Sequence, residues 1–103
     1  MIGPGKADLM DLIEETGSIA AAGRRMGMSY KRAWMLVETL NAMFHAPLVE
    51  SFRGGATGGG ARLTDLGRNV LSRYRALEEL AREAGGVEIA AIERLRGDMS
   101  GDT

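Results

Sequence analysis

The fold is decided by residues 29–44, which read SYKRAWMLVETLNAMF. Apolar residues recur there at spacings of three and four, which predicts one buried stripe on a helix: Ala33, Val37, Leu40 and Phe44. Ser29 is a good N-cap, because its hydroxyl can accept a hydrogen bond from a free backbone N–H of the first turn. The positive end of the helix dipole, with Lys31 and Arg32 beside it, favours an anionic partner. The alternative is a core helix with a solvated basic end.

Two shorter helices are predicted before this stretch. The first covers residues 6–16, preceded by a loose terminus around Pro4 that we expect not to be helical. The second covers residues 19–26 after the N-cap Ser18, and its small residues let another helix approach closely. Gly27 then turns the chain, so a short helix, a tight turn and a longer helix follow one another. This order is typical of a helix-turn-helix, although many other helical hairpins share it.

A glycine-rich hairpin is predicted after the longer helix. Residues 48–53 contain β-branched and aromatic residues and read as a strand, residues 54–60 as a loop, and residues 61–64 as a second short strand. The loop lacks the Lys-Ser or Lys-Thr pair of a P-loop and the strand-to-helix context of a dinucleotide site. A hairpin directly after a helix-turn-helix indicates a wing.

The rest of the chain is predicted to be helical. Thr64 can cap a long helix that completes a domain over residues 1–84. Two glycines interrupt the pattern and open a short segment, 85–103. Within it, residues 87–95 are expected to form a fifth helix and residues 97–103 to be frayed or disordered. The fold class is therefore mainly α with a small β-hairpin, a winged helix-turn-helix with a long C-terminal dimerisation helix.

The net charge of −1 hides a basic middle between acidic ends. Residues 18–75 hold nine Lys and Arg against three Asp and Glu, a balance of +6, whereas the preceding residues carry −3 and the following ones −4. A basic surface of this kind is the electrostatic footprint of a protein that binds a polyanion.

Several function classes find no support in the 103 residues. There is no cysteine and only one histidine, His45, so neither a metal site nor a Cys nucleophile is indicated. No pair of carboxylates stands out as an acid/base couple, and we predict neither enzyme activity nor a cofactor. No apolar run approaches the roughly 20 residues of a membrane span, and the N-terminus lacks a signal-peptide pattern, so a cytoplasmic protein is expected.

Four segments together resemble a known family. Residues 29–34 read SYKRAW, residues 40–41 read LN, residues 48–50 read LVE and residues 54–67 read GGATGGGARLTDLG. They are similar to the DNA-binding domain of the molybdate-dependent transcriptional regulators, the ModE family, and the last segment also resembles the wing and following helix of LysR-type regulators. The resemblance implies a homodimer that binds a palindromic operator in double-stranded DNA, with helix 29–44 in the major groove and the wing, 53–62, on the backbone or in the minor groove.

Candidate DNA contacts follow from this resemblance, residue by residue. They are Arg24, Arg25, Ser29, Tyr30, Lys31, Arg32, Met35, Arg53, Thr57 and Arg62. Lys31 or Arg32 could read the acceptor edge of guanine, whereas Arg24 and Arg25 would hold phosphate without sequence choice. Trp34 adjoins the apolar stripe, so it either packs in the core or lies at the rim of the contact surface, and Tyr30 either contacts DNA or covers the helix packing.

Dimerisation is predicted from the far half of the long helix. Its apolar positions exceed what the core of one chain needs: Tyr74, Leu77, Leu80, Ala81 and Ala84. Either the first helix or residues 87–95 of the same chain cover them, or a second copy does. The regulators that the chain resembles carry molybdate-binding modules, and the residues beyond Gly85 are too few for one, so molybdate or another oxyanion is a doubtful effector for this sequence. The rival functions are a winged-helix docking module without DNA and a small-anion sensor.

Overall fold

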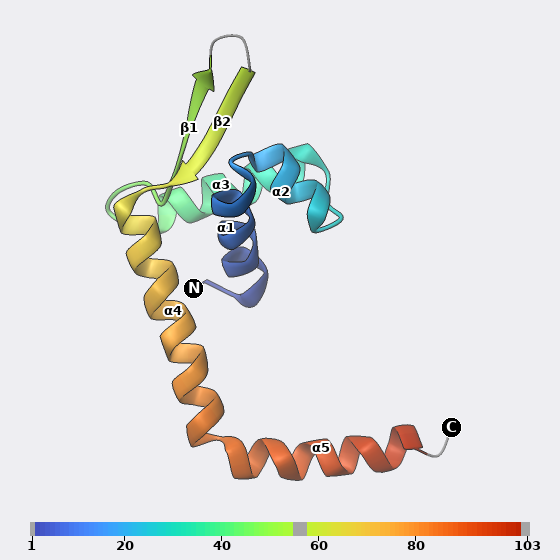
Figure 1. Cartoon of the computed structure of the whole chain (residues 1–103). Helices are drawn as coiled ribbons and strands as arrows, with labels where there is room; N and C mark the ends of the chain where they lie inside the picture. Colours follow the sequence, from blue (N-terminus) through green and yellow to red (C-terminus); the bar gives the residue numbers. More distant parts are fainter. Residues whose placement is uncertain (1, 55–57, 102–103) are drawn as a thin grey trace.

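The computed structural model describes residues 2–54 and 58–101, which form a winged helix-turn-helix with two further helices (Figure 1). The elements are α1 (Pro4–Thr16), α2 (Ile19–Arg25), α3 (Tyr30–Met43), β1 (Val49–Gly54), β2 (Gly58–Leu63), α4 (Asp65–Ala84) and α5 (Gly86–Gly101). The predicted fold class is confirmed: the chain is mainly helical, and its two strands form one antiparallel hairpin.

The helix-turn-helix is held by caps and by a close approach of its two helices. The hydroxyl of Ser18 accepts a hydrogen bond from the N–H of Ala21 at 3.0 Å, and that of Ser29 accepts from Arg32 at 3.1 Å. Gly27 turns the chain with a φ of 73°, a left-handed conformation that favours glycine. At Gly23 an added Cβ would lie 2.8 Å from the Cβ of Ala33, so α2 and α3 can approach each other this closely only because position 23 is glycine.

The wing is joined to the helices at its base. The hairpin pairs Val49 with Leu63 and continues to Gly54 and Gly58. The N–H of Ala61 donates to the carbonyl of Gly17 at 2.9 Å, which fastens β2 to the turn between α1 and α2. Because side chains alternate along a strand, the buried residues at the base point into the core, and the tip projects beyond the helices (Figure 1).

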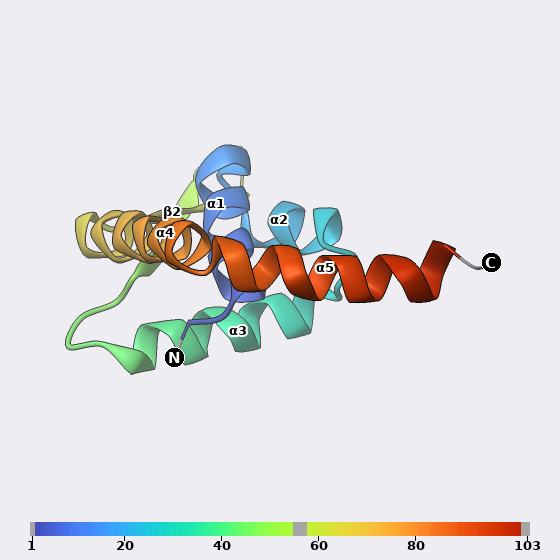
Figure 2. The same ribbon diagram turned by 90° about the horizontal axis from the view of Figure 1, so that it is seen from below.

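The core lies where α1, α3 and the wing base meet. Its largest fully buried side chains are Leu9, Met10, Ile13, Leu40, Leu48 and Leu63. The first turns of α4 complete it, with Leu71 buried. Beyond that point α4 runs out of the domain as a rod and α5 turns aside from its end, giving the chain extents of 56 × 32 × 20 Å (Figures 1 and 2).

Several predicted boundaries are wrong. Helix α1 begins at Pro4 rather than Lys6, because a proline at the first helical position needs no N–H partner and already has a helical φ. The second strand starts at Gly58 rather than Ala61, and α5 continues to Gly101 through residues expected to fray. Phe44, predicted in the buried stripe of α3, is 38% exposed, because the helix ends at Met43 and the backbone becomes extended.

Ion pairs connect α1 with α4. The guanidinium of Arg75 binds Asp8 at 2.8 Å and Asp11 at 2.6 Å, and it also binds Glu78 on its own helix. Two turns nearer the wing, Nε of Arg68 donates to Glu14 at 2.8 Å. Asp8, Asp11 and Glu14 of α1 thus pair with arginines of α4 while remaining partly exposed to water.

No helix among the described residues is both long enough and apolar enough to cross a membrane.

Replacing Gly67 by alanine should strongly destabilise the fold. The added Cβ would lie 2.1 Å from the carbonyl oxygen of Leu48, and a backbone atom cannot rotate away. We expect a loss of about 3 kcal/mol or more in the free energy of unfolding, measured by urea titration with circular dichroism. Gly86→Ala is the matched control, because nothing lies within 4 Å of its added Cβ. Equal stability of the two variants would contradict the packing described here.

The Glu14–Arg68 hydrogen bond should make stability depend on pH. The Arg68 guanidinium lowers the pKa of Glu14 below its ordinary value, so the stabilisation is present above the unfolded pKa and is lost as pH falls through the folded one. From about pH 6 to about pH 3 the parent should lose more unfolding free energy than Glu14→Gln does. The difference should stay below about 1 kcal/mol, because these side chains are 39% and 48% exposed.

The control for this pH series is Glu83→Gln, since Glu83 has no ion pair within residues 2–54 and 58–101. Its acid dependence should match the parent. If the free energy of unfolding fell equally with pH in the parent and in Glu14→Gln, Glu14 would not be a source of the pH dependence.

Candidate nucleic-acid interface

Helix α3 presents one exposed stripe to solvent. Lys31, Met35, Glu38 and Ala42 recur at spacings of four, three and four, and all four are exposed. Arg32 lies beside this stripe and is also exposed. Sequence reasoning selected Lys31 and Met35 and missed Glu38, although the same spacing counted from Lys31 would have found it. The stripe therefore offers a cation, an apolar side chain and a carboxylate acceptor along one helix face.

Two aromatic residues occupy the side of α3 that faces the wing. Tyr30 is 59% exposed, and its ring meets the ring of Trp34 edge-on, with 6.1 Å between centroids and 75° between planes. Trp34 is half-buried: it packs against the core and also lines a surface cleft. The predicted packing of Trp34 against the core is therefore observed, and its place at the rim of a DNA contact surface stays a prediction.

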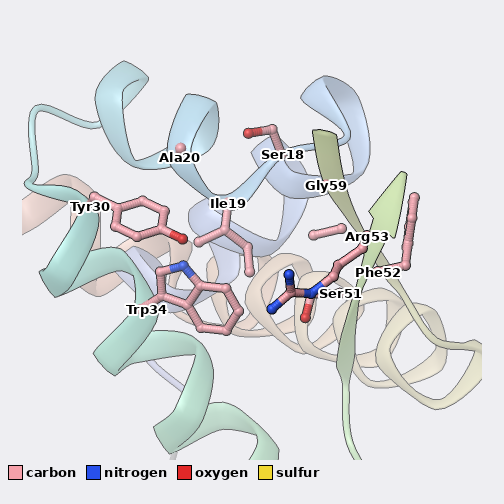
Figure 3. Close-up of a pocket in the computed structure, with 11 residues that line it drawn as sticks. Ser18, Ile19, Ala20, Tyr30, Trp34, Ser51, Phe52, Arg53 and Gly59 are labelled. Carbon is pink, nitrogen blue, oxygen red and sulfur yellow. The ribbon is translucent and has the colours of Figure 1, made fainter. Parts of the chain in front are cut away.

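A cleft of about 520 Å³ separates these aromatic residues from the wing (Figure 3). The start of α2 forms one side, with Ser18 and Ile19. The wing forms the opposite side, and Arg53 extends from β1 into the cleft in the direction of Trp34. No carboxylate lines the cleft, so its one charged side chain is a cation.

The predicted cations differ in whether a carboxylate already holds them. Within residues 2–54 and 58–101, no ion pair is formed by Arg24, Lys31, Arg32 or Arg53. By contrast Arg25 pairs with Glu15, and Arg62 pairs with Glu50 at 2.6 Å. The unpaired group lies in the last turn of α2, the first turn of α3 and the wing.

The wing carries its two predicted cations on opposite faces. Strand alternation places Arg53 with Ser51 on the face that lines the cleft. Arg62 lies on the other face, where its guanidinium carbon is 5.4 Å from the ring centroid of Phe52 and its Nε binds Glu50. The structure therefore does not bring Arg53 and Arg62 together. Thr57, the third predicted wing contact, lies outside the described residues.

The candidate dimerisation residues are mostly exposed. Leu77 and Leu80 are 52% and 62% exposed, and Ala81 and Ala84 are exposed as well. Tyr74 is half-buried against the core of its own chain. No cluster of three or more potential metal ligands occurs among residues 2–54 and 58–101.

Comparison with known proteins places this geometry in a family. Residues 8–68 match the model of the "Bacterial regulatory helix-turn-helix protein, lysR family". The chain is 40% identical to the molybdenum transport protein ModE of Azotobacter vinelandii, over 89% of this chain and 38% of that protein. It is 35% identical to the DNA-binding transcriptional dual regulator ModE of Escherichia coli K12, over 79% of this chain and 31% of that protein. The chain thus spans roughly a third of these relatives.

A solved structure supports the same assignment. The fold is similar to the crystal structure of a CbnR_DBD–DNA complex, with a TM-score of 0.66 and 26% identity over 88% of this chain and 99% of that chain. The family model covers the helix-turn-helix, the wing and the first turn of α4. The chain therefore belongs to the lysR family of bacterial regulatory helix-turn-helix proteins, and it is a regulatory protein rather than an enzyme.

Proposed function

We propose that this chain is the DNA-binding part of a transcriptional regulator and acts as a homodimer on a palindromic operator. The observation that carries the proposal is the set of cations without a carboxylate partner around the start of α3: Arg24, Lys31, Arg32 and Arg53. A protein surface that leaves cations unpaired beside an exposed helix favours a polyanion. DNA is the polyanion whose major groove admits an α-helix.

The exposed stripe of α3 suits the reading of base edges. Lys31 and Arg32 can donate to the acceptors of guanine, and Glu38 can accept from the amino group of cytosine. Met35 between them supplies an apolar contact. Arg24, at the end of α2, would hold a phosphate and so fix the register of the helix in the groove.

Dimerisation through α4 would complete the proposed regulator. The far half of α4 extends out of the domain (Figure 1), and Leu77 and Leu80 on it are 52% and 62% exposed. A second copy related by a two-fold axis would bury both and present two copies of α3 about 34 Å apart, one turn of DNA. Because such a regulator works where bacterial DNA is, we place it in the cytoplasm.

The first test is selection of DNA from a random duplex library, followed by sequencing of the retained fraction. Enrichment of a palindrome is expected, with half-sites centred about one helical turn apart. Enrichment of one half-site without a symmetric second half-site would contradict the homodimer but would still support DNA binding. If the protein retained no duplex even at low salt, DNA binding would be refuted and a docking module that binds protein would be favoured.

Substitutions should separate base reading from phosphate binding. Arg32→Ala should cost about 1–3 kcal/mol on the selected site and much less on unrelated DNA, because only the selected site offers its base edge. Arg24→Ala should weaken both alike and reduce the salt slope by about 0.9, the value for one phosphate contact. Arg73→Ala, an exposed change on α4, is the control. Identical behaviour of Arg32→Ala and Arg24→Ala would refute the assignment of the recognition face.

A further inference from the structure

We infer that the cleft between α3 and the wing binds one sugar-phosphate unit of the DNA backbone, with the phosphate at Arg53 and the deoxyribose against Trp34. This inference rests on the proposed function and specifies how the DNA strand is held. It assigns a ligand to the cleft and gives Trp34 a contact that neither the recognition face nor the core requires.

The polar side of the cleft is arranged for an anion. Arg53 is exposed, extends into the cleft and has no ion pair or hydrogen bond among the described residues. Its cross-strand partner is Gly59, so no neighbouring side chain blocks the guanidinium. Ser51 on the same wing face and Tyr30 on α3 add hydroxyl donors. A phosphodiester oxygen can accept from such groups without displacing a carboxylate.

The apolar side of the cleft is arranged for a sugar. The half-buried Trp34 ring and Ile19 from the start of α2 lie across from Arg53 (Figure 3). A deoxyribose has an apolar edge at its 2′ carbon, which can pack on the exposed part of the Trp34 ring, with the buried Ile19 behind it, whereas a ribose would bring its hydroxyl there and lose hydration. The cleft therefore combines a cationic wall with an apolar wall, as a sugar-phosphate unit requires.

The position of the cleft matches the path of a DNA strand. If α3 lies in the major groove and the wing reaches the backbone beyond it, the strand between them must cross the space that separates Tyr30 from Arg53. The volume of about 520 Å³ falls within the range of about 300–1,000 Å³ typical of small-ligand sites. The cleft is open to solvent rather than enclosed, which a continuous strand needs.

Trp34 is the one tryptophan in the sequence, so its fluorescence reports directly on the cleft. The test titrates the full chain with the duplex retained by selection, or with mixed-sequence duplex at low salt if no site is enriched. Binding is followed by anisotropy of labelled DNA, and Trp34 exposure by acrylamide quenching. We expect acrylamide quenching of Trp34 to decrease as DNA binds. Arg53→Ala should weaken binding about tenfold and abolish this protection, whereas Arg73→Ala should change neither.

Every outcome decides the inference. DNA binding with unchanged quenching of Trp34 would overturn the cleft assignment while leaving the proposed function intact. Absence of DNA binding would overturn both. Protection of Trp34 by sodium phosphate or sodium molybdate alone, as complete as that by DNA, would also overturn it in favour of a small-anion site. Trp34→Phe, which keeps a ring in the core, should bind DNA more weakly than the parent while its unfolding transition stays cooperative.

Discussion

The side chain of Asn41 fixes the angle between α3 and the wing. Its carbonyl oxygen accepts from the N–H groups of Leu48 at 2.9 Å and Val49 at 3.0 Å, and its amide group donates to the carbonyl of Val49 at 3.0 Å. One residue of α3 thus holds Val49, the first residue of β1, and Leu48 before it through hydrogen bonds to their backbone. Because Trp34 and Arg53 belong to the two elements joined in this way, the width of the cleft between them depends on this amide.

The start of α4 is fixed at the same place. The N–H of Thr64 donates to the carbonyl of Leu48 at 2.9 Å, and its hydroxyl caps α4 by accepting from the N–H of Gly67 at 3.0 Å. The missing side chain of Gly67 lets the helix lie directly on Leu48. Leu48 therefore contacts both helices: Asn41 of α3 binds its N–H, and Thr64 and Gly67 place the start of α4 against its carbonyl. In a dimer formed by α4, the same contacts would determine the separation of the two recognition helices.

The sequence alone predicted the features that depend only on neighbouring residues, such as helix caps. Ser18, Ser29 and Thr64 were identifiable as caps because a cap needs only its own next turn. The exposed side of α3 followed from helix periodicity. The sequence did not reveal which carboxylate each cation would bind. The ion pairs Arg25–Glu15 and Arg62–Glu50 join residues 10 and 12 positions apart, and no spacing rule specifies the geometry of the turns between them. The cleft was missed for the same reason, since its walls come from α2, α3 and both strands of the wing.

Ion pairing changes what the basic middle of the chain means. The count of +6 over residues 18–75 includes Arg62, Arg68 and Arg75, all of which already contact carboxylates. A DNA phosphate would have to displace those carboxylates, at a cost of up to about 1 kcal/mol for each exposed ion pair. A cation without an ion pair can bind a phosphate without losing a carboxylate partner. Apart from Arg73, which hydrogen-bonds to Asn69 on α4, the cations of residues 18–75 that form no ion pair with a described residue lie at the end of α2, at the start of α3 and on the cleft side of the wing, which is the surface that we propose for DNA.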